Sequence, residues 1–178
     1  MTHLEPFAKS DISRLTSWVI DADFLLQWAG PSFTFPLDKA QLKRHLAAAG
    51  GKEPGLLPYR AVEEKTGQVV GHVELANINR RHGSAVLCRV LIGPPEARGR
   101  GLGREMVRQA LQVAFDELGL HRVSLNVYTY NAAAIACYQS LGFQTEGTLR
   151  ESTRVGDQYW SGHVMSLLEH EWRSSEGT

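Results

Sequence analysis

Apolar and polar residues follow two spacings along this chain, one typical of strands and one typical of helices. Alternating or continuously apolar stretches of strand length lie at 3–7, 59–64, 68–78, 85–92, 122–128, 143–151 and 159–168. Helical spacing with suitable capping residues is found at 10–19, 38–49, 102–118 and 131–141. The order is strand, two helices, three strands, helix, strand, helix and two strands. It predicts a mixed α/β (α+β) fold with about seven strands and about four helices.

The strongest helical pattern runs from Leu102 to Leu118. Apolar residues at 102, 106, 107, 110, 111, 114 and 118 form one stripe, which predicts a helix packed on the core. Residues 24–36 lack such a pattern, because aromatic residues there are interrupted by two prolines and a glycine. We expect this segment to be irregular. Ser10 and Asp38 are the expected caps of the first two helices.

Composition narrows the class of protein. A chain of 178 residues suits one domain, which we expect over 1–173 with a polar tail over 174–178. Lys plus Arg and Asp plus Glu number 19 each, so no basic surface for nucleic acid is expected. No long apolar run and no basic-then-apolar leader occurs, which predicts a cytoplasmic protein without a membrane segment. The two cysteines and seven histidines lack the spacing of metal ligands, so no metal is expected.

A glycine-rich run, Arg98-Gly99-Arg100-Gly101-Leu102-Gly103, follows an apolar strand and opens the long helix. Glycine lets backbone N–H groups approach an oxyanion at the positive end of a helix, so the run predicts a phosphate cradle. A dinucleotide fingerprint would need glycine where Arg104 stands, and a P-loop would need Gly-Lys-Ser/Thr. The run therefore indicates a different phosphorylated cofactor.

A second segment follows one helix and one strand later. Asn131 opens a predicted helix, Tyr138 comes seven residues later, and Gly142-Phe143 follows its end. Seven residues at about 100° each return to nearly the same helix face, so Asn131 and Tyr138 point the same way, with Ala134 between them. An N-cap, a core aromatic and a C-terminal glycine are the alternative interpretation of these residues.

The two segments together resemble the GNAT superfamily of acyl-coenzyme A dependent N-acyltransferases. Arg98, Gly101 and Gly103 fill its Arg-x-x-Gly-x-Gly pattern, and the order of elements is similar to the whole fold. The resemblance implies a mixed, mostly antiparallel sheet whose strands splay apart at the cofactor site. It implies acetyl-coenzyme A as donor, a primary amine as acceptor, and a cofactor site formed by Val90, Leu91, Ile92, Arg98, Gly99, Arg100, Gly101, Leu102, Gly103, Arg104, Asn126, Asn131, Ala134 and Tyr138.

Features outside these segments resemble the ribosomal-protein N-terminal acetyltransferase-like branch of the superfamily. They include Trp28-Ala29-Gly30-Pro31, Glu146-Gly147 and Glu171-Trp172. That branch also contains enzymes that act on polyamines, aminoglycosides and other small amines. The acceptor can therefore be a small amine or a peptide N-terminus, and a homodimer is compatible with the sequence.

The expected reaction needs two proton transfers. The amine must lose a proton before it attacks the thioester, and the leaving thiolate benefits from a donor. The resemblance assigns the donor role to Tyr138. The strand over 85–92 lacks the glutamate that many members carry there. His72 and Glu74 share one face of the neighbouring strand and could relay a proton, although a solvated sheet face explains them equally well; His163 is a weaker candidate.

An aromatic wall with one carboxylate would suit a cationic acceptor. The residues expected to form this acceptor pocket are Trp28, Phe33, His72, Glu74 and Trp160. A plain lid over the core is the alternative for the aromatic segment. A non-catalytic coenzyme A-binding regulatory protein of the same fold is the alternative function. The missing strand glutamate favours that alternative, whereas Tyr138 argues against it; a ribosome-associated RNA binder is disfavoured by the zero net charge.

Overall fold

The computed structural model describes residues 1–176, which build one seven-stranded sheet. Its strands are β1 (Thr2–Pro6), β2 (Leu56–Glu63), β3 (Gln68–Asn79), β4 (Ser84–Ile92), β5 (Arg122–Tyr128), β6 (Gln144–Val155) and β7 (Gln158–Leu168). They lie in the order β1-β2-β3-β4-β5-β7-β6, and β4 and β5 are the one parallel pair in this described sheet. The predicted mixed, mostly antiparallel sheet of seven strands is confirmed.

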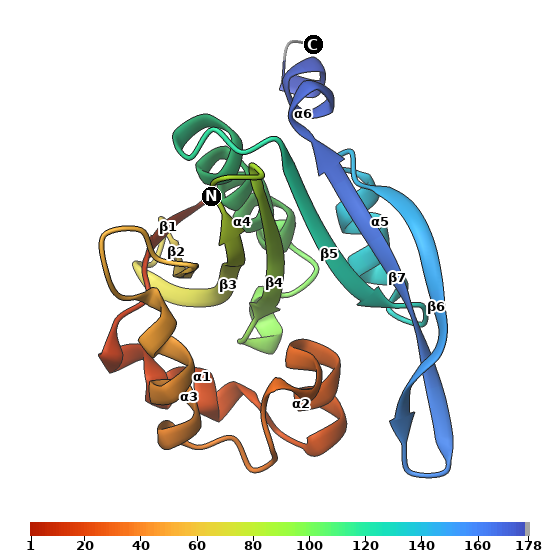
Figure 1. The fold of residues 1–178 in the computed structure, drawn as a ribbon. Coiled ribbons are helices and arrows are strands. Elements are labelled where there is room, and N and C mark those ends of the chain that lie inside the picture. The colour runs from red at the N-terminus through yellow and green to blue at the C-terminus, as the bar shows by residue number, and fades with distance from the viewer. Residues whose placement is uncertain (177–178) are drawn as a thin grey trace.

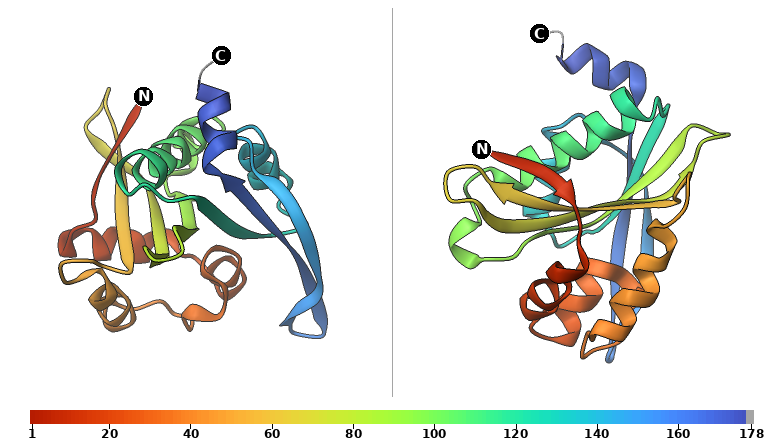
Figure 2. Two further views of the ribbon diagram at one scale, coloured as in Figure 1. Left: turned by 45° about the horizontal axis from the view of Figure 1, so that its top comes forward. Right: turned by 90° about the vertical axis from the view of Figure 1, so that its left-hand side faces the viewer.

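Helices cover both faces of the sheet. They are α1 (Ile12–Trp18), α2 (Ala22–Ala29), α3 (Lys39–Leu46), α4 (Leu102–Gln112), α5 (Ala132–Gln139) and α6 (Glu169–Glu176). Short 3-10 turns lie at Lys9–Asp11, Gly30–Ser32, Ala47–Ala49 and Pro95–Ala97, and a π-helical segment, Val113–Glu117, continues α4. Helix α4 lies on one face and α1 to α3 lie on the other (Figure 2). Apolar stripes on both sides therefore bury two separate clusters against the sheet.

Strands β4 and β5 separate soon after they begin. They pair only where Ser84–Val86 meets Arg122–Ser124, and beyond that point the two strands diverge (Figure 1). Strand β4 also carries a bulge against β3, because Cys88 faces Glu74 while Leu91 faces His72. Arg89 lies in this bulge at a φ of 52°. The divergence leaves the far half of β4 without a partner on its β5 side, as the predicted splay requires.

The segment expected to be irregular contains a helix, so that expectation was wrong. Helix α2 covers Ala22–Ala29, and the Asp21 side chain caps it by accepting a hydrogen bond from the Phe24 amide at 2.7 Å. Leu25 and Trp28 on its inner face are buried against β4 and its neighbours. Gly30, Pro31 and Pro36 mark only the end of the helix and the loop after it, not the whole segment.

The helix count of about four was also too low, because α6 follows β7 directly. It continues to Glu176, into the stretch expected as a polar tail; residues 177–178 lie outside the described part. Trp172 holds this helix to the core by stacking on Phe115 at a centroid distance of 5.9 Å. At the first helix the N-cap is Asp11 rather than Ser10, and the Asp11 side chain accepts a hydrogen bond from the preceding Ala8 amide at 2.8 Å.

Candidate functional site

The divergence of β4 and β5 opens a cleft with a volume of about 1190 Å³. Its wall is built from α2, β4, the start of α4, β5 and α5, with β6 and β7 closing one side. Nine of the residues predicted to bind the cofactor line this cleft: Val90, Leu91, Ile92, Arg98, Gly103, Asn126, Asn131, Ala134 and Tyr138. Segments far apart in the sequence thus meet around one elongated space.

The glycine run forms an open turn at the N-terminus of α4. Gly99 and Gly101 have φ angles of 71° and 79°, and a Cβ on either would meet no heavy atom within 4 Å. Gly101 is the N-cap of α4. It has no side chain that could cap the first backbone amides of the helix, so these amides stay available to a ligand. The turn therefore has the open, positively polarised backbone that a phosphate group requires.

The arginines of this run bind neighbouring parts of the protein. Arg98 donates to the Ile92 and Gly93 carbonyl oxygens at 3.0 and 2.9 Å, which fixes the end of β4. Arg100 pairs with Glu63, and Arg104 donates to the Ser140 hydroxyl at 3.0 Å. Leu102 is buried beneath the turn. The backbone amides are consequently the freest donors for an anion, and the arginines add nearby positive charge.

Tyr138 lies on α5, whose N-cap is Asn131. The Asn131 side chain accepts a bond from the Ala134 amide at 3.3 Å. Tyr138 is 8% exposed and lines the cleft, and its ring meets Phe143 edge to face at 5.8 Å. Burial, with the thiols of Cys137 and Cys88 nearby, raises the pKa of the Tyr138 phenol above its usual value. The hydroxyl therefore remains a proton donor throughout the neutral and mildly alkaline range.

Glu74 is the centre of a buried polar cluster. Its side chain is 1% exposed. Its carboxylate accepts hydrogen bonds from His72 Nε2 and His45 Nε2, both at 2.9 Å, and from the Arg89 guanidinium at 2.8 Å. Burial alone would raise the pKa of Glu74, but the bonds from His45 and His72 and the positive charge of Arg89 outweigh it and lower the pKa well below the usual range.

The cluster contains one carboxylate, one guanidinium and two imidazoles. The Glu74 carboxylate is an acceptor only, so each imidazole donates to it through Nε2. Glu74 and His72 lie behind the cleft wall, whereas His45, with 18% of its side chain exposed, lines the cleft itself. The arrangement holds the His45 ring in one orientation and one tautomer.

Sequence reasoning missed His45 and Arg89. His45 is 29 positions from Glu74 and reaches it only because α3 packs over β3, so no local pattern could link them. Arg89 had a visible signal, since it is the charged residue within an otherwise apolar strand. Its guanidinium lies 5.4 Å from the centre of the Phe33 ring.

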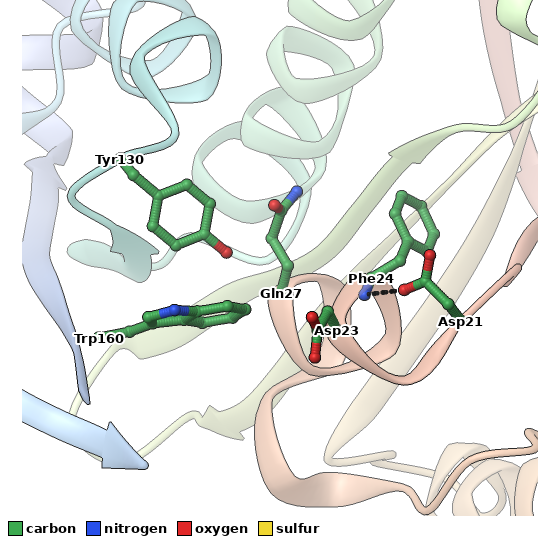
Figure 3. Close-up of a pocket in the computed structure, with 6 residues that line it drawn as sticks. All are labelled: Asp21, Asp23, Phe24, Gln27, Tyr130 and Trp160. Atoms are coloured by element: carbon green, nitrogen blue, oxygen red, sulfur yellow. Dashed lines mark hydrogen bonds between the residues drawn. The ribbon is translucent and has the colours of Figure 1, made fainter. Parts of the chain in front are cut away.

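The residues predicted for the acceptor pocket lie in three places. Trp28 lines the cleft, and Phe33 stacks behind it at 6.4 Å. His72 and Glu74 are buried beneath. Trp160 lines a smaller, separate pocket of about 360 Å³ with Asp21, Asp23, Phe24, Gln27 and Tyr130 (Figure 3). The residues predicted to form one acceptor pocket therefore do not share one space, because Trp28 lines the cleft and Trp160 lines the adjoining pocket.

Both cysteines are free and line the cleft. Burial raises the pKa of the Cys88 thiol to about 12, and burial also raises the pKa of Cys137. Both thiols therefore stay protonated at neutral pH. Within residues 1–176, no helix is long and apolar enough to cross a membrane.

Comparison with known proteins gives a consistent set of relatives. A sequence model of the acetyltransferase (GNAT) family matches residues 22–143, more than half of the chain. Spermidine N(1)-acetyltransferase of Vibrio cholerae is 33% identical over 111 residues, which cover 62% of this chain and 63% of that protein. The putative ribosomal N-acetyltransferase YdaF of Bacillus subtilis is 27% identical over 134 residues, covering 75% of this chain and 68% of that protein.

Solved structures give the same fold. The crystal structure of spermidine N-acetyltransferase from Vibrio cholerae in complex with CoA and spermine has a TM-score of 0.82 to this chain. The two sequences are 23% identical, and the match covers 97% of this chain and 98% of that one. At the sequence level, the chain spans less than two thirds of the length of the spermidine acetyltransferases it matches.

Proposed function

The chain belongs to the acetyltransferase (GNAT) family, and from that premise we propose that it transfers the acetyl group of acetyl-coenzyme A directly to a primary amine. The observation that carries this proposal is the single cleft between β4 and β5, which joins the open glycine turn at one end to the Tyr138 hydroxyl. Relatives named as spermidine N(1)-acetyltransferases support an amine as the acceptor.

The cleft suits coenzyme A along its whole length. The amides at 99–104 would hold the pyrophosphate, with Arg98 and Arg104 adding positive charge near the adenosine end. The backbone of Val90, Leu91 and Ile92, unpaired on its β5 side, would bind the amides of the pantetheine arm. Leu102 lies under the turn and supports its shape, and Gly99, Arg100 and Gly101 form the turn itself.

Bound acetyl-coenzyme A supplies a thioester, whose carbonyl carbon forms the new bond to nitrogen while its bond to sulfur breaks. Tyr138 donates its phenolic proton to the departing sulfur, a role supported by its position in the cleft and its raised pKa. The raised pKa values of Cys88 and Cys137 argue against a cysteine nucleophile, which favours direct transfer.

We propose His45 as the acceptor of the amine proton, with Glu74 as the residue that positions it. The Glu74 carboxylate takes the Nε2 proton of His45 in a hydrogen bond, so Nδ1 carries the lone pair. Glu74 would then stabilise the imidazolium that forms, in the way a buried carboxylate supports a catalytic histidine. His72 and Arg89 keep the carboxylate charged and fixed. Glu74 thus acts through His45, whereas the sequence suggested a proton relay through His72 and Glu74.

A reaction screen tests this proposal. Amines, polyamines and N-terminal peptides are each incubated with acetyl-coenzyme A, and the release of free thiol is measured. We expect thiol release to depend on at least one amine. Tight binding of coenzyme A without thiol release across the panel would instead support the regulatory alternative, a coenzyme A-binding protein without turnover.

Two further proposals concern the branch of the family to which the chain belongs and its oligomeric state. The 27% identity to a putative ribosomal N-acetyltransferase over 75% of this chain supports the ribosomal-protein N-terminal acetyltransferase-like branch. The spermidine relatives favour a small amine within that branch. We further propose a homodimer, because the edge strand β6 is exposed along most of its length, with Leu149 at 51%. Sedimentation velocity measures this directly, and a monomer at micromolar concentration would contradict it.

A further inference from the structure

A second pocket adjoins the cleft at the N-terminal end of α2. Its wall contains Tyr130, from the turn after β5, and Trp160, from β7, opposite residues of α2 (Figure 3). Phe24 and Gln27 line both this pocket and the large cleft. The two spaces are therefore separated by one turn of α2, and an extended molecule could occupy both.

One wall of this pocket is an aromatic cage, in which Tyr130 and Trp160 line the pocket and Tyr128, which lines the adjoining cleft, packs against both. The Tyr128 and Tyr130 rings stack at 5.8 Å with an interplanar angle of 6°, and Trp160 meets both edge to face at 5.1 and 4.9 Å. Tyr130 nevertheless stays 48% exposed at the pocket. Rings held in this way present their negative faces without losing conformational freedom on binding, which favours a cation.

The opposite wall is negative and without a protein counter-ion. Asp21 accepts only the capping bond from the Phe24 amide, and within the described residues neither it nor Asp23 forms an ion pair with Lys, Arg or His. No basic side chain lines the pocket. Burial, Tyr128 and the charge of Asp23 raise the pKa of Tyr130 to about 12, so its phenol stays neutral beside these carboxylates.

We propose that this pocket binds the distal ammonium of an aliphatic diamine or polyamine whose other end is acetylated in the adjoining cleft. The inference rests on the proposed function and adds the class of acceptor. The two ends of such a substrate have opposite needs. The reacting amine must lose its proton near His45, whereas the distal amine keeps its charge between the aromatic cage and the carboxylates.

The test compares amines that differ only in the distal charge. Putrescine and cadaverine are matched with n-butylamine and n-pentylamine, and kcat/KM is measured for each at saturating acetyl-coenzyme A. We expect the diamines to be preferred, mainly through KM. Asp23→Asn should lower the ratio of diamine to monoamine kcat/KM by about tenfold, the size of a partly desolvated charge contact. Asp116→Asn, an exposed carboxylate on the α4 side of the sheet, is the matched control and should keep the ratio.

A binding measurement separates this inference from the proposed function. Calorimetric titration of the folded protein with putrescine should give binding that weakens in Asp23→Asn and in Trp160→Leu. Putrescine binding that depends on Asp23, without acetylation of any amine, would support the pocket and reject the proposed transfer. Acetylation with equal kcat/KM for diamines and monoamines, or a preference unchanged in both variants, would overturn the pocket assignment.

Discussion

At the scale of single residues, the proposed chemistry depends most directly on the Tyr138 hydroxyl. Tyr138→Phe removes only that oxygen, and the ring can keep its edge-to-face contact with Phe143. If the phenol protonates the leaving thiolate, kcat should fall by roughly 10²–10⁴ while the affinity for coenzyme A is nearly preserved. Single-turnover kinetics measure the chemical step. Tyr59→Phe, a half-buried tyrosine of β2 outside the cleft, is the control, and an unchanged rate in Tyr138→Phe would return Tyr138 to a packing role.

Glu74 should contribute to stability in a way that depends on pH. Its folded-state pKa is lowered, so the stabilisation is fully present above its unfolded value of 4.5 and is lost as the pH falls through the folded-state value. Glu74→Gln leaves Arg89 without its buried counter-charge, and we expect a loss of roughly 3–5 kcal/mol at neutral pH. Urea denaturation measures this loss.

The difference between wild type and Glu74→Gln should shrink as the pH falls below 4.5, because Glu74 then takes up a proton in the unfolded state while the folded state still holds it ionised. Glu96→Gln, at an exposed position, should change little at any pH. A difference between wild type and Glu74→Gln that stays constant from neutral to acidic pH would show that the charge of Glu74 is not what stabilises the cluster.

At the scale of elements, a single substitution in the turn before α4 should abolish cofactor binding without loss of the fold. Gly101→Val introduces strain at a φ of 79°, of about 1–2 kcal/mol, and places its Cβ where no protein atom lies within 4 Å. That empty position is where we place the pyrophosphate, so coenzyme A binding should be lost while circular dichroism stays native. Gly119→Val carries similar strain at 61° with equally open space, away from the cleft. Equal coenzyme A affinity in the two variants would exclude the turn as the phosphate site.

Some elements could be predicted from sequence because their signals are local. The long helix after the glycine run and the capping roles of Asp38 and Asn131 follow from spacing and residue type. Helix α2 was not predicted, because the prolines at 31 and 36 indicated an irregular segment. They lie in the loop after the helix, whose capping residue is Asp21. Contacts between residues far apart in the sequence could not be predicted from local spacing. The bonds of His45 and Arg89 to Glu74 depend on how α3 and the β4 bulge pack on β3.

At the scale of the whole molecule, the residues proposed to bind the cofactor, to accept the amine proton and to protonate the thiolate line one continuous cleft. The parallel contact of β4 with β5 holds the sheet together at one end, and the divergence beyond it admits a cofactor between the two halves. Helices α2 and α3 then cover the open side and bring His45 and Trp28 to the cleft. Direct transfer requires this geometry, since both substrates must be bound together.

Direct transfer is the central claim, and a single reaction tests it. The protein is mixed with acetyl-coenzyme A and putrescine, and the same samples are assayed for free thiol and, by mass spectrometry, for acetylated amine and acetylated protein. We predict one acetylated amine for each thiol released, with no acetyl group on the protein at any time. Thiol release without acetylated amine, or an acetyl-protein that forms and decays before the product appears, would contradict the account.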